Sequence, residues 1–249
     1  MKLALHPVDA RMISVQAYLD EYGARALQGE APQPRCPLCH RALLLIGALS
    51  TRIRPRFSHG ANCRLPCPLV RHGDLPDGLR IDPSPDVHVS VAQRHAYVSR
   101  WEWHLQRMRR DDLLPSMPVE RFLSLAELAT QGGLWRQAGL HPALVPYLQL
   151  AMAGFLPGER GTRHGGSSVR FWFDGSAGSV ADVQALRDPA PRFYKAYYAR
   201  PRLATVPSQH HMFHLEEVAL DLGFLAGPRP GMPAADVEAC WAWLSGRGS

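Results

Sequence analysis

The sequence Cys36-Pro37-Leu38-Cys39 is followed by Phe57-Ser58-His59 and then by Cys63 and Cys67, so four of the five cysteines share one short segment. Two thiolates separated by two residues can face a single zinc ion at about 2.3 Å from one turn. A second group of ligands some twenty residues later can supply the other half of a tetrahedral site. The stretch therefore predicts a zinc ribbon, and it governs the expected fold of the N-terminal part of the chain.

The residues between the two groups of ligands predict a β-hairpin. An apolar run begins at position 41, and the run that follows alternates Ile53 and Phe57 with basic residues, which is the pattern of a half-buried strand. One face of the hairpin is then apolar and the other is strongly basic. The arginines expected to contact nucleic acid are Arg52, Arg54, Arg56 and Arg64.

The positive charge of the chain favours a polyanionic partner. The net charge is +6, and all the basic residues except Lys2 and Lys195 are arginine. Arginine suits phosphate because its planar guanidinium can donate two hydrogen bonds to one anion. A GC-rich genome, which replaces lysine by arginine throughout, is the alternative explanation for the arginine excess.

The cysteine segment also resembles a known family. A Cys-Pro-x-Cys turn, a hairpin and the segment Arg56-Phe57-Ser58-His59 ahead of a further cysteine are similar to the N-terminal zinc-finger region of competence protein CoiA-like proteins. The resemblance covers about residues 30–70, roughly a sixth of the chain. Some members of that family carry a nuclease-like domain, but its Asp…(Asp/Glu)-x-Lys arrangement has no counterpart in this sequence.

The resemblance implies that Cys36, Cys39 and His59 are zinc ligands. The spacing leaves the fourth ligand open between Cys63 and Cys67, and an all-cysteine site without His59 is a third option. A tetrahedral ion takes four of these five residues. A site filled by four protein ligands has no open position, so the zinc is expected to be structural rather than catalytic.

We expect an α+β fold, in which a small zinc-ribbon β-hairpin module precedes a mainly α-helical domain with a short β element. The module spans residues 1–70, a proline-rich linker spans 71–88, and the helical domain spans 89–249. Strands are expected at 3–5 and 169–173. Helices are expected at 14–26, 90–110, 125–131, 134–138, 142–155, 180–186, 192–198, 212–222 and 234–244.

A second cluster of metal-ligand residue types lies near the C-terminus. In a helix, His210, His214 and Glu217 would share one face and could hold an ion. Together with Asp174 and Asp182, this cluster gives the hypothesis of a divergent metal-dependent nuclease. The His-Glu-x-x-His order of a zinc hydrolase is absent, so the sequence favours a non-catalytic protein.

The sequence as a whole predicts a nucleic-acid-binding protein with a structural Zn²⁺ and with DNA as the expected partner. The alternative is a protein–protein adaptor in which the zinc site only stabilises a small module. No segment approaches the roughly 20 apolar residues of a membrane span, and the first residues do not form a signal peptide. We therefore expect a cytoplasmic protein without a membrane partner.

Overall fold

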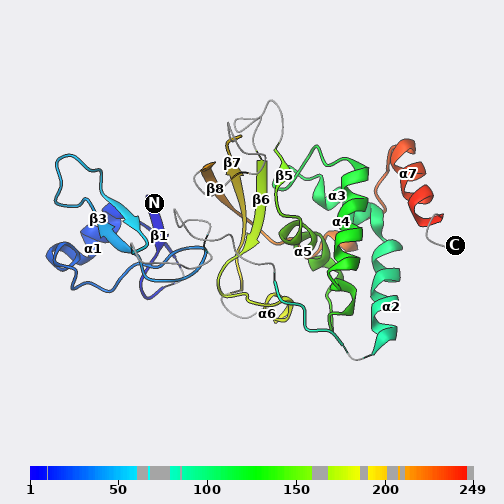
Figure 1. The fold of residues 1–249 in the computed structure, drawn as a ribbon, viewed down its shortest axis with the longest axis horizontal. Coiled ribbons are helices and arrows are strands. Elements are labelled where there is room, and N and C mark those ends of the chain that lie inside the picture. Colours follow the sequence, from blue (N-terminus) through cyan, green and yellow to red (C-terminus); the bar gives the residue numbers. More distant parts are fainter. Residues whose placement is uncertain are drawn as a thin grey trace. The chain divides into compact units, whose positions relative to one another are not determined.

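The computed structural model describes the whole chain except residues 10, 61–66, 68–78, 85, 159–167, 186–189, 201–206, 208–210 and 246–249. The chain divides into two compact units. The first comprises Met1–Asp77 with Asp174–Ser176, and the second comprises Gly78–Phe173 with Ala177–Ser249. Two β-hairpins precede a series of helices and a sheet, which confirms the predicted α+β class (Figure 1). Much of the predicted linker at 71–88 lies outside the described residues.

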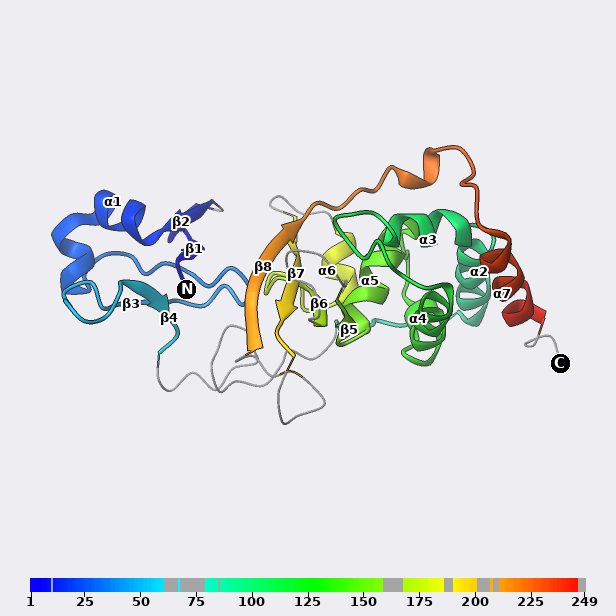
Figure 2. The same cartoon turned by 90° about the horizontal axis from the view of Figure 1, so that it is seen from above.

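Two small hairpins and one helix form the first unit (Figure 2). Strand β1 (Leu3–Leu5) pairs with β2 (Met12–Ser14), and β3 (Leu44–Ile46) pairs with β4 (Arg56–Ser58), both antiparallel. Helix α1 (Val15–Gln28) follows β2 directly, and the hydroxyl of its N-cap residue accepts a hydrogen bond from the first turn. The predicted strand at 3–5, the helix and the second hairpin are therefore present.

Phe57 is the centre of the packing in the first unit. Its side chain is fully buried, and its ring meets the edge of the Tyr18 ring of α1 at 5.6 Å. Its backbone N–H donates to the carbonyl of Met1 at 2.9 Å, and the Met1 amino group donates back to the Phe57 carbonyl at 2.7 Å.

The second strand predicted for the hairpin begins only at Arg56. Ile53, which we expected on the apolar face, lies in the connecting loop and is 48% exposed.

Helices make up the larger part of the second unit. The helix predicted at 90–110 is two helices, α2 (Val87–Val98) and α3 (Trp101–Met108), because the backbone leaves the helical conformation at Arg100. The remaining α-helices are α4 (Val119–Gln131), α5 (Val145–Met152), α6 (Val180–Gln184) and α7 (Ala234–Ser245). Short 3-10 helices span Leu134–Arg136, Pro142–Leu144 and Phe224–Ala226.

An antiparallel sheet with the order β5-β6-β7-β8 completes the second unit, and it is larger than the predicted short β element. Its strands are β5 (Leu156–Pro157), β6 (Ser168–Phe173), β7 (Phe193–Tyr198) and β8 (Met212–Val218). The helices predicted at 192–198 and 212–222 are wrong, since both segments pair as strands. Five of the six residues of β7 are buried, Lys195 among them, so the strand lacks the alternation of a half-exposed strand.

One face of the sheet packs on α5 and forms the core of the second unit. The rings of Phe171 and Phe193 stack at 5.5 Å, and the ring of Tyr147 from α5 meets Phe193 edge-on at 5.4 Å. All three side chains are almost completely buried within one large apolar cluster. None of the described residues of the cysteine segment belongs to this core.

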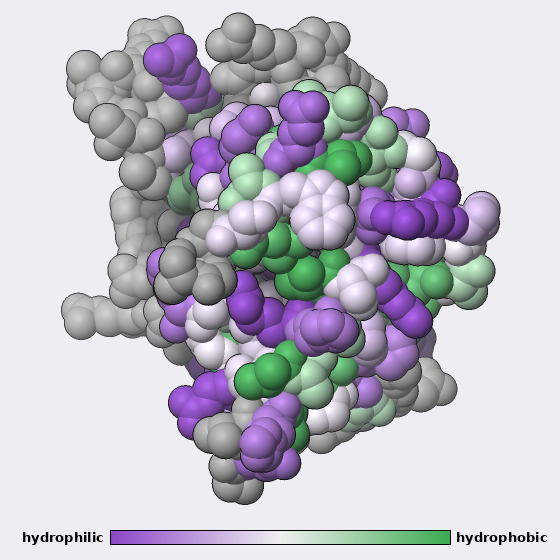
Figure 3. Space-filling view, turned by 90° about the vertical axis from the view of Figure 1, so that its right-hand side faces the viewer, coloured by the Kyte–Doolittle hydropathy of each residue, from purple (hydrophilic) through white to green (hydrophobic). Residues whose placement is uncertain are grey.

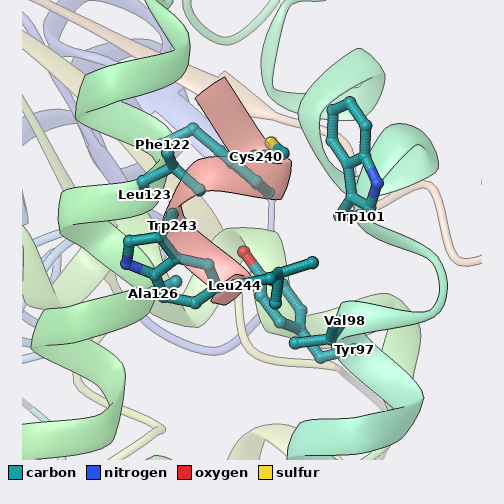
Figure 4. A pocket seen from close by; sticks show the side chains of 9 residues that line it. All are labelled: Tyr97, Val98, Trp101, Phe122, Leu123, Ala126, Cys240, Trp243 and Leu244. Carbon is teal, nitrogen blue, oxygen red and sulfur yellow. The ribbon is translucent and has the colours of Figure 1, made fainter. Parts of the chain in front are cut away.

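Helix α7 packs against α4, and residues of α2, α3, α4 and α7 enclose a small apolar pocket (Figure 4). The Cys240 thiol lies in the pocket wall, and the indole N–H of Trp243 donates to the Glu127 carboxylate of α4 at 2.8 Å. On this side of the molecule, apolar side chains gather at the centre with polar ones around them (Figure 3). The pocket is therefore part of the contact that holds α7 on the helices.

His104 of α3 is a buried titratable group in the same unit. Its side chain has no exposed surface, neither ring nitrogen has a hydrogen-bond partner among the described residues, and its ring lies 4.7 Å from that of Tyr97. Burial in apolar surroundings disfavours the imidazolium and lowers the pKa of His104 from 6.5 to about 3, and the nearby Arg100 adds to the effect.

We predict that His104 makes the second unit sensitive to acid. The unfolded chain binds a proton at this residue below pH 6.5, whereas the folded chain stays neutral there down to about pH 3. The free energy of unfolding therefore falls as the pH falls through this window, by up to about 1.4 kcal/mol per pH unit from this residue. Urea titrations of His104→Phe should show a shallower decline, whereas the exposed control His95→Phe should keep the decline of the unsubstituted protein.

Candidate metal centre

A tight turn presents the first two cysteines. The backbone N–H of Cys36 donates to the Arg41 carbonyl at 2.7 Å, and the N–H of His40 donates to the Cys36 carbonyl at 2.9 Å. His40 closes the turn with a φ of 56°, in the left-handed region that non-glycine residues seldom adopt. The N–H of Leu38 points at the Cys36 sulfur at 3.4 Å. The turn thus aims both sulfurs at one point, as the Cys-x-x-Cys spacing predicts.

The structure brings four of the five predicted ligands together. One candidate ligand atom from each of Cys36, Cys39, His59 and Cys67 lies within 4.8 Å of all the others. The cluster joins the turn to residues just after β4 and to a position 31 residues beyond Cys36. Cys63, the other candidate for the fourth ligand, lies outside the described residues. These four residues form a possible metal-binding site.

Two distances within the cluster are close to those around a tetrahedral ion. A tetrahedron with metal–sulfur bonds of 2.3 Å has sulfur–sulfur edges of about 3.8 Å, and a sulfur–nitrogen edge is about 3.5 Å. The Cys36 and Cys67 sulfurs are 3.7 Å apart, and the Cys39 sulfur is 3.3 Å from the His59 Nε2. All the described cysteines are free thiols, so no disulfide competes for these sulfurs.

The three thiols of the cluster hold their protons unequally. Burial raises the pKa of Cys36 to about 12, and hydrogen bonds from the Cys36 and Cys67 thiols lower the pKa of Cys39. Hydrogen bonds with Cys36 and Cys39, together with burial, raise the pKa of Cys67. One negative charge is thus held at Cys39 while the other two sulfurs keep protons that a cation must displace. A metal ion bound by these residues would therefore displace protons, and its affinity would rise with pH.

Contacts around the ligands hold the turn in place. Within the first unit, the His40 Nε2 lies 3.1 Å from a carboxylate oxygen of Asp174. A Cβ atom on Gly175 would come within 2.9 Å of the Cys39 backbone, so only glycine permits this approach. Burial opposes ionisation of Asp174, but its hydrogen bonds with His40 and Ser176 outweigh that effect and lower its pKa. Asp174 therefore supports the turn as a carboxylate.

The predicted nucleic-acid-binding arginines lie on the loop between β3 and β4 and at the start of β4. Arg52, Arg54 and Arg56 are all exposed, and none of them has an ion pair or a side-chain hydrogen bond within the described part of the chain. Arg64 lies outside the described residues. The hairpin next to the cysteine cluster therefore presents three uncompensated positive charges.

The second predicted metal cluster does not form as we expected. His214 and Glu217 belong to strand β8, whereas the prediction required a helix. Successive side chains of a strand point to opposite faces, so two residues three positions apart cannot converge on one ion. His210 lies outside the described residues. The helical spacing on which the prediction depended is therefore wrong.

The carboxylates assigned to the nuclease hypothesis have structural partners. Asp182 accepts hydrogen bonds from the backbone N–H groups of Gly178 and Ser179 and from the Ser179 hydroxyl, which makes it the third residue of a capping box at the start of α6. Asp174 is held by His40 and Ser176. Both carboxylates are thus accounted for by local structure.

The chain matches no protein-family model, no curated protein and no solved structure. Within the described residues, the helices are too short or too polar to cross a lipid bilayer. The geometry of the cysteine cluster and the charges beside it are therefore the features that point to a function.

We predict that Cys36→Ser and Cys67→Ser each abolish stoichiometric metal binding, because each removes one of four converging ligands. Native mass spectrometry of the purified protein should show one metal ion per chain, and none in either variant. Cys240→Ser is the matched control, since that thiol lies on α7 in the second unit and should leave the metal content unchanged. Retention of a full equivalent of metal by Cys67→Ser would show that the cluster is not the site.

Proposed function

We propose that this protein is a zinc-ribbon nucleic-acid-binding protein, with DNA as its partner and with a zinc ion that has a structural role. The observation that carries the proposal is the position of three exposed, unpaired arginines on the hairpin that begins and ends next to the Cys3His cluster. The metal fixes the hairpin, and the hairpin supplies the charge. The resemblance to CoiA-like proteins remains a prediction that agrees with this assignment.

Zinc is the ion that the ligand set favours. Three thiolates and one imidazole in tetrahedral positions are typical of structural zinc, whereas carboxylate and carbonyl oxygens are the ligands that magnesium and calcium prefer. Free thiols at this density also suit the reducing cytoplasm predicted from the sequence. With four protein ligands, the ion keeps no position for a water molecule or a substrate, so we assign it no part in catalysis.

Several arginines of the second unit have side-chain partners that the hairpin arginines lack. In the second unit, Arg107 donates to both carboxylate oxygens of Asp112 and to the Tyr147 hydroxyl, and Arg109 donates to Asp236. The guanidinium of Arg94 lies over the Trp243 ring at 5.8 Å. These arginines of the predicted basic-aromatic helix contribute to packing. The hairpin arginines have no such partners and are available for phosphate groups.

The cysteine cluster and the exposed arginines support a nuclease or a protein–protein adaptor less well than a nucleic-acid-binding protein. A nuclease would need carboxylates that converge on a metal, and the structural roles of Asp174 and Asp182 leave neither in such a place. In a protein–protein adaptor, the zinc site would only stabilise the fold of the first unit. Such a protein would not need a cluster of uncompensated arginines beside the site. Nucleic acid is the partner that makes use of both the charge and the rigid hairpin.

We predict that removal of the metal unfolds the first unit while the second stays folded. The first unit has few buried apolar residues, and a structural zinc ion contributes about 10 kcal/mol or more to such a small module. After treatment with a strong chelator, limited proteolysis should cleave between residues 1 and 77 and spare the second unit, whose apolar core is separate from the cysteine cluster. Restoring Zn²⁺, but not Mg²⁺, should restore protection. Equal protection of residues 1–77 with and without the chelator would argue against a structural metal.

We predict that binding to duplex DNA depends steeply on salt, because each phosphate contact releases counterions. Replacing Arg52, Arg54 and Arg56 together by Gln should weaken binding by more than tenfold. It should also lower the slope of log K against log salt by up to about 3. Fluorescence anisotropy with a labelled duplex at several salt concentrations measures both quantities.

The matched control is the replacement by Gln of three exposed arginines of the second unit, Arg110, Arg121 and Arg136. It removes the same charge from the chain and should leave most of the affinity. Equal losses in the two triple variants would mean that only the net charge matters. Absence of salt-sensitive binding by the unsubstituted protein would exclude the proposed function.

A further inference from the structure

The loop between β3 and β4 is closed by hydrogen bonds and exposes an apolar side chain. The N–H of Ser50 donates to the Gly47 carbonyl at 3.2 Å, and the Ser50 hydroxyl accepts from the backbone N–H groups of Arg52 and Ile53 at 3.1 and 3.0 Å. Gly47 has a φ of +77°, and a Cβ atom there would lie 2.9 Å from the Ile53 side chain. The loop is thus closed on itself, and its shape requires glycine at position 47.

Leu49 lies at the tip of this turn and is 78% exposed, the highest exposure among the large apolar side chains that the structure describes. A single exposed leucine is common on protein surfaces and needs no explanation by itself. Here, however, it is held by a hydrogen-bonded turn and is followed within seven residues by three exposed arginines. The segment 47–56 contains no acidic residue.

The loop thus exposes two apolar side chains, Leu49 and the half-exposed Ile53, within a segment that also exposes three arginines. Proteins that kink duplex DNA use this combination: an apolar side chain enters between two base pairs while arginines hold the flanking phosphates or the minor groove. A turn that is ordered in advance reduces the entropy lost on binding. A tip of one leucine is also small enough to fit between two adjacent base pairs.

We propose that Leu49 is a wedge that enters a base-pair step of duplex DNA while Arg52, Arg54 and Arg56 bind the phosphates around it. This inference rests on the proposed nucleic-acid function and adds the mode of binding. Insertion of Leu49 costs less energy where neighbouring base pairs unstack easily. The protein should therefore bind duplexes with flexible TA steps more tightly than duplexes with stiff A-tracts. An anionic membrane surface is the other partner that could accept an apolar tip with basic flanks.

The experiment uses the full-length zinc-loaded protein and duplexes with 2-aminopurine at a TA step, since its fluorescence rises when it unstacks. The unsubstituted protein should raise the fluorescence on binding. Leu49→Ala should abolish the rise and weaken binding by about tenfold, as expected for the loss of a buried leucine side chain, while the dependence on salt stays unchanged. Val8→Ala is the control, because Val8 is similarly exposed (74%) in another turn of the same unit.

Each outcome separates the wedge from the proposed function. Salt-sensitive binding by the unsubstituted protein without a rise in fluorescence, or equal affinity of Leu49→Ala, overturns the wedge and leaves nucleic-acid binding intact. Co-sedimentation with phosphatidylserine vesicles that Leu49→Ala loses, with no effect of the substitution on duplex binding, assigns the tip to a membrane and also overturns the wedge. Failure of every variant to bind duplex DNA overturns the proposed function and the wedge together. Metal content of each variant confirms that the hairpin is folded.

Discussion

The convergence of three sulfurs and one imidazole is the constraint on which the first unit depends. The hairpin β3–β4 is short, with three residues in each strand, and a hairpin of this size is marginal alone in water. The cluster ties the residue that follows β4 to the turn that precedes β3 and to a position further along the chain. A metal ion held by the four residues would link these separate segments of the chain in the folded state. The geometry of the hairpin therefore follows from the cluster as much as from its own strand pairing.

The second unit is stabilised in a different way. Its large apolar cluster includes aromatic residues of the sheet, α5 and the surrounding helices, and the buried Arg107 and Glu102 are paired with opposite charges. Because a buried guanidinium without a partner is costly, arginines such as Arg107 are fixed by carboxylates and hydroxyls. The hairpin arginines of the first unit are solvated and need no such partners. Arginine thus contributes to packing where it is buried, as at Arg107, and to surface charge where it is exposed, as in the hairpin.

Local patterns in the sequence predicted local structure well. The Cys-x-x-Cys spacing specified a turn, and the alternation around Phe57 specified a strand whose apolar side chain is buried. The segments 193–198 and 212–218 were harder, because short segments that mix aromatic and apolar residues with charged ones fit a strand as well as a helix. Pairing with strands far away in the sequence decides between these alternatives, and such pairing has no local signal. The nuclease hypothesis depended on the helical spacing of His214 and Glu217 and is weakened for that reason.

The sequence by itself determined the kind of site: the ligand types, the turn that holds the first two, and the basic character of the hairpin all follow from spacing and composition. Only the tertiary structure decided that Cys67 joins Cys36, Cys39 and His59, because the closure of a 31-residue separation depends on the path of the chain in space. It also decided which arginines stay free, since whether a guanidinium finds a carboxylate depends on packing between distant elements. The exposure of Leu49 is likewise decided by the tertiary structure. The hydrogen bonds of Ser50 and the close packing at Gly47, which shape the loop, appear only when the loop is folded.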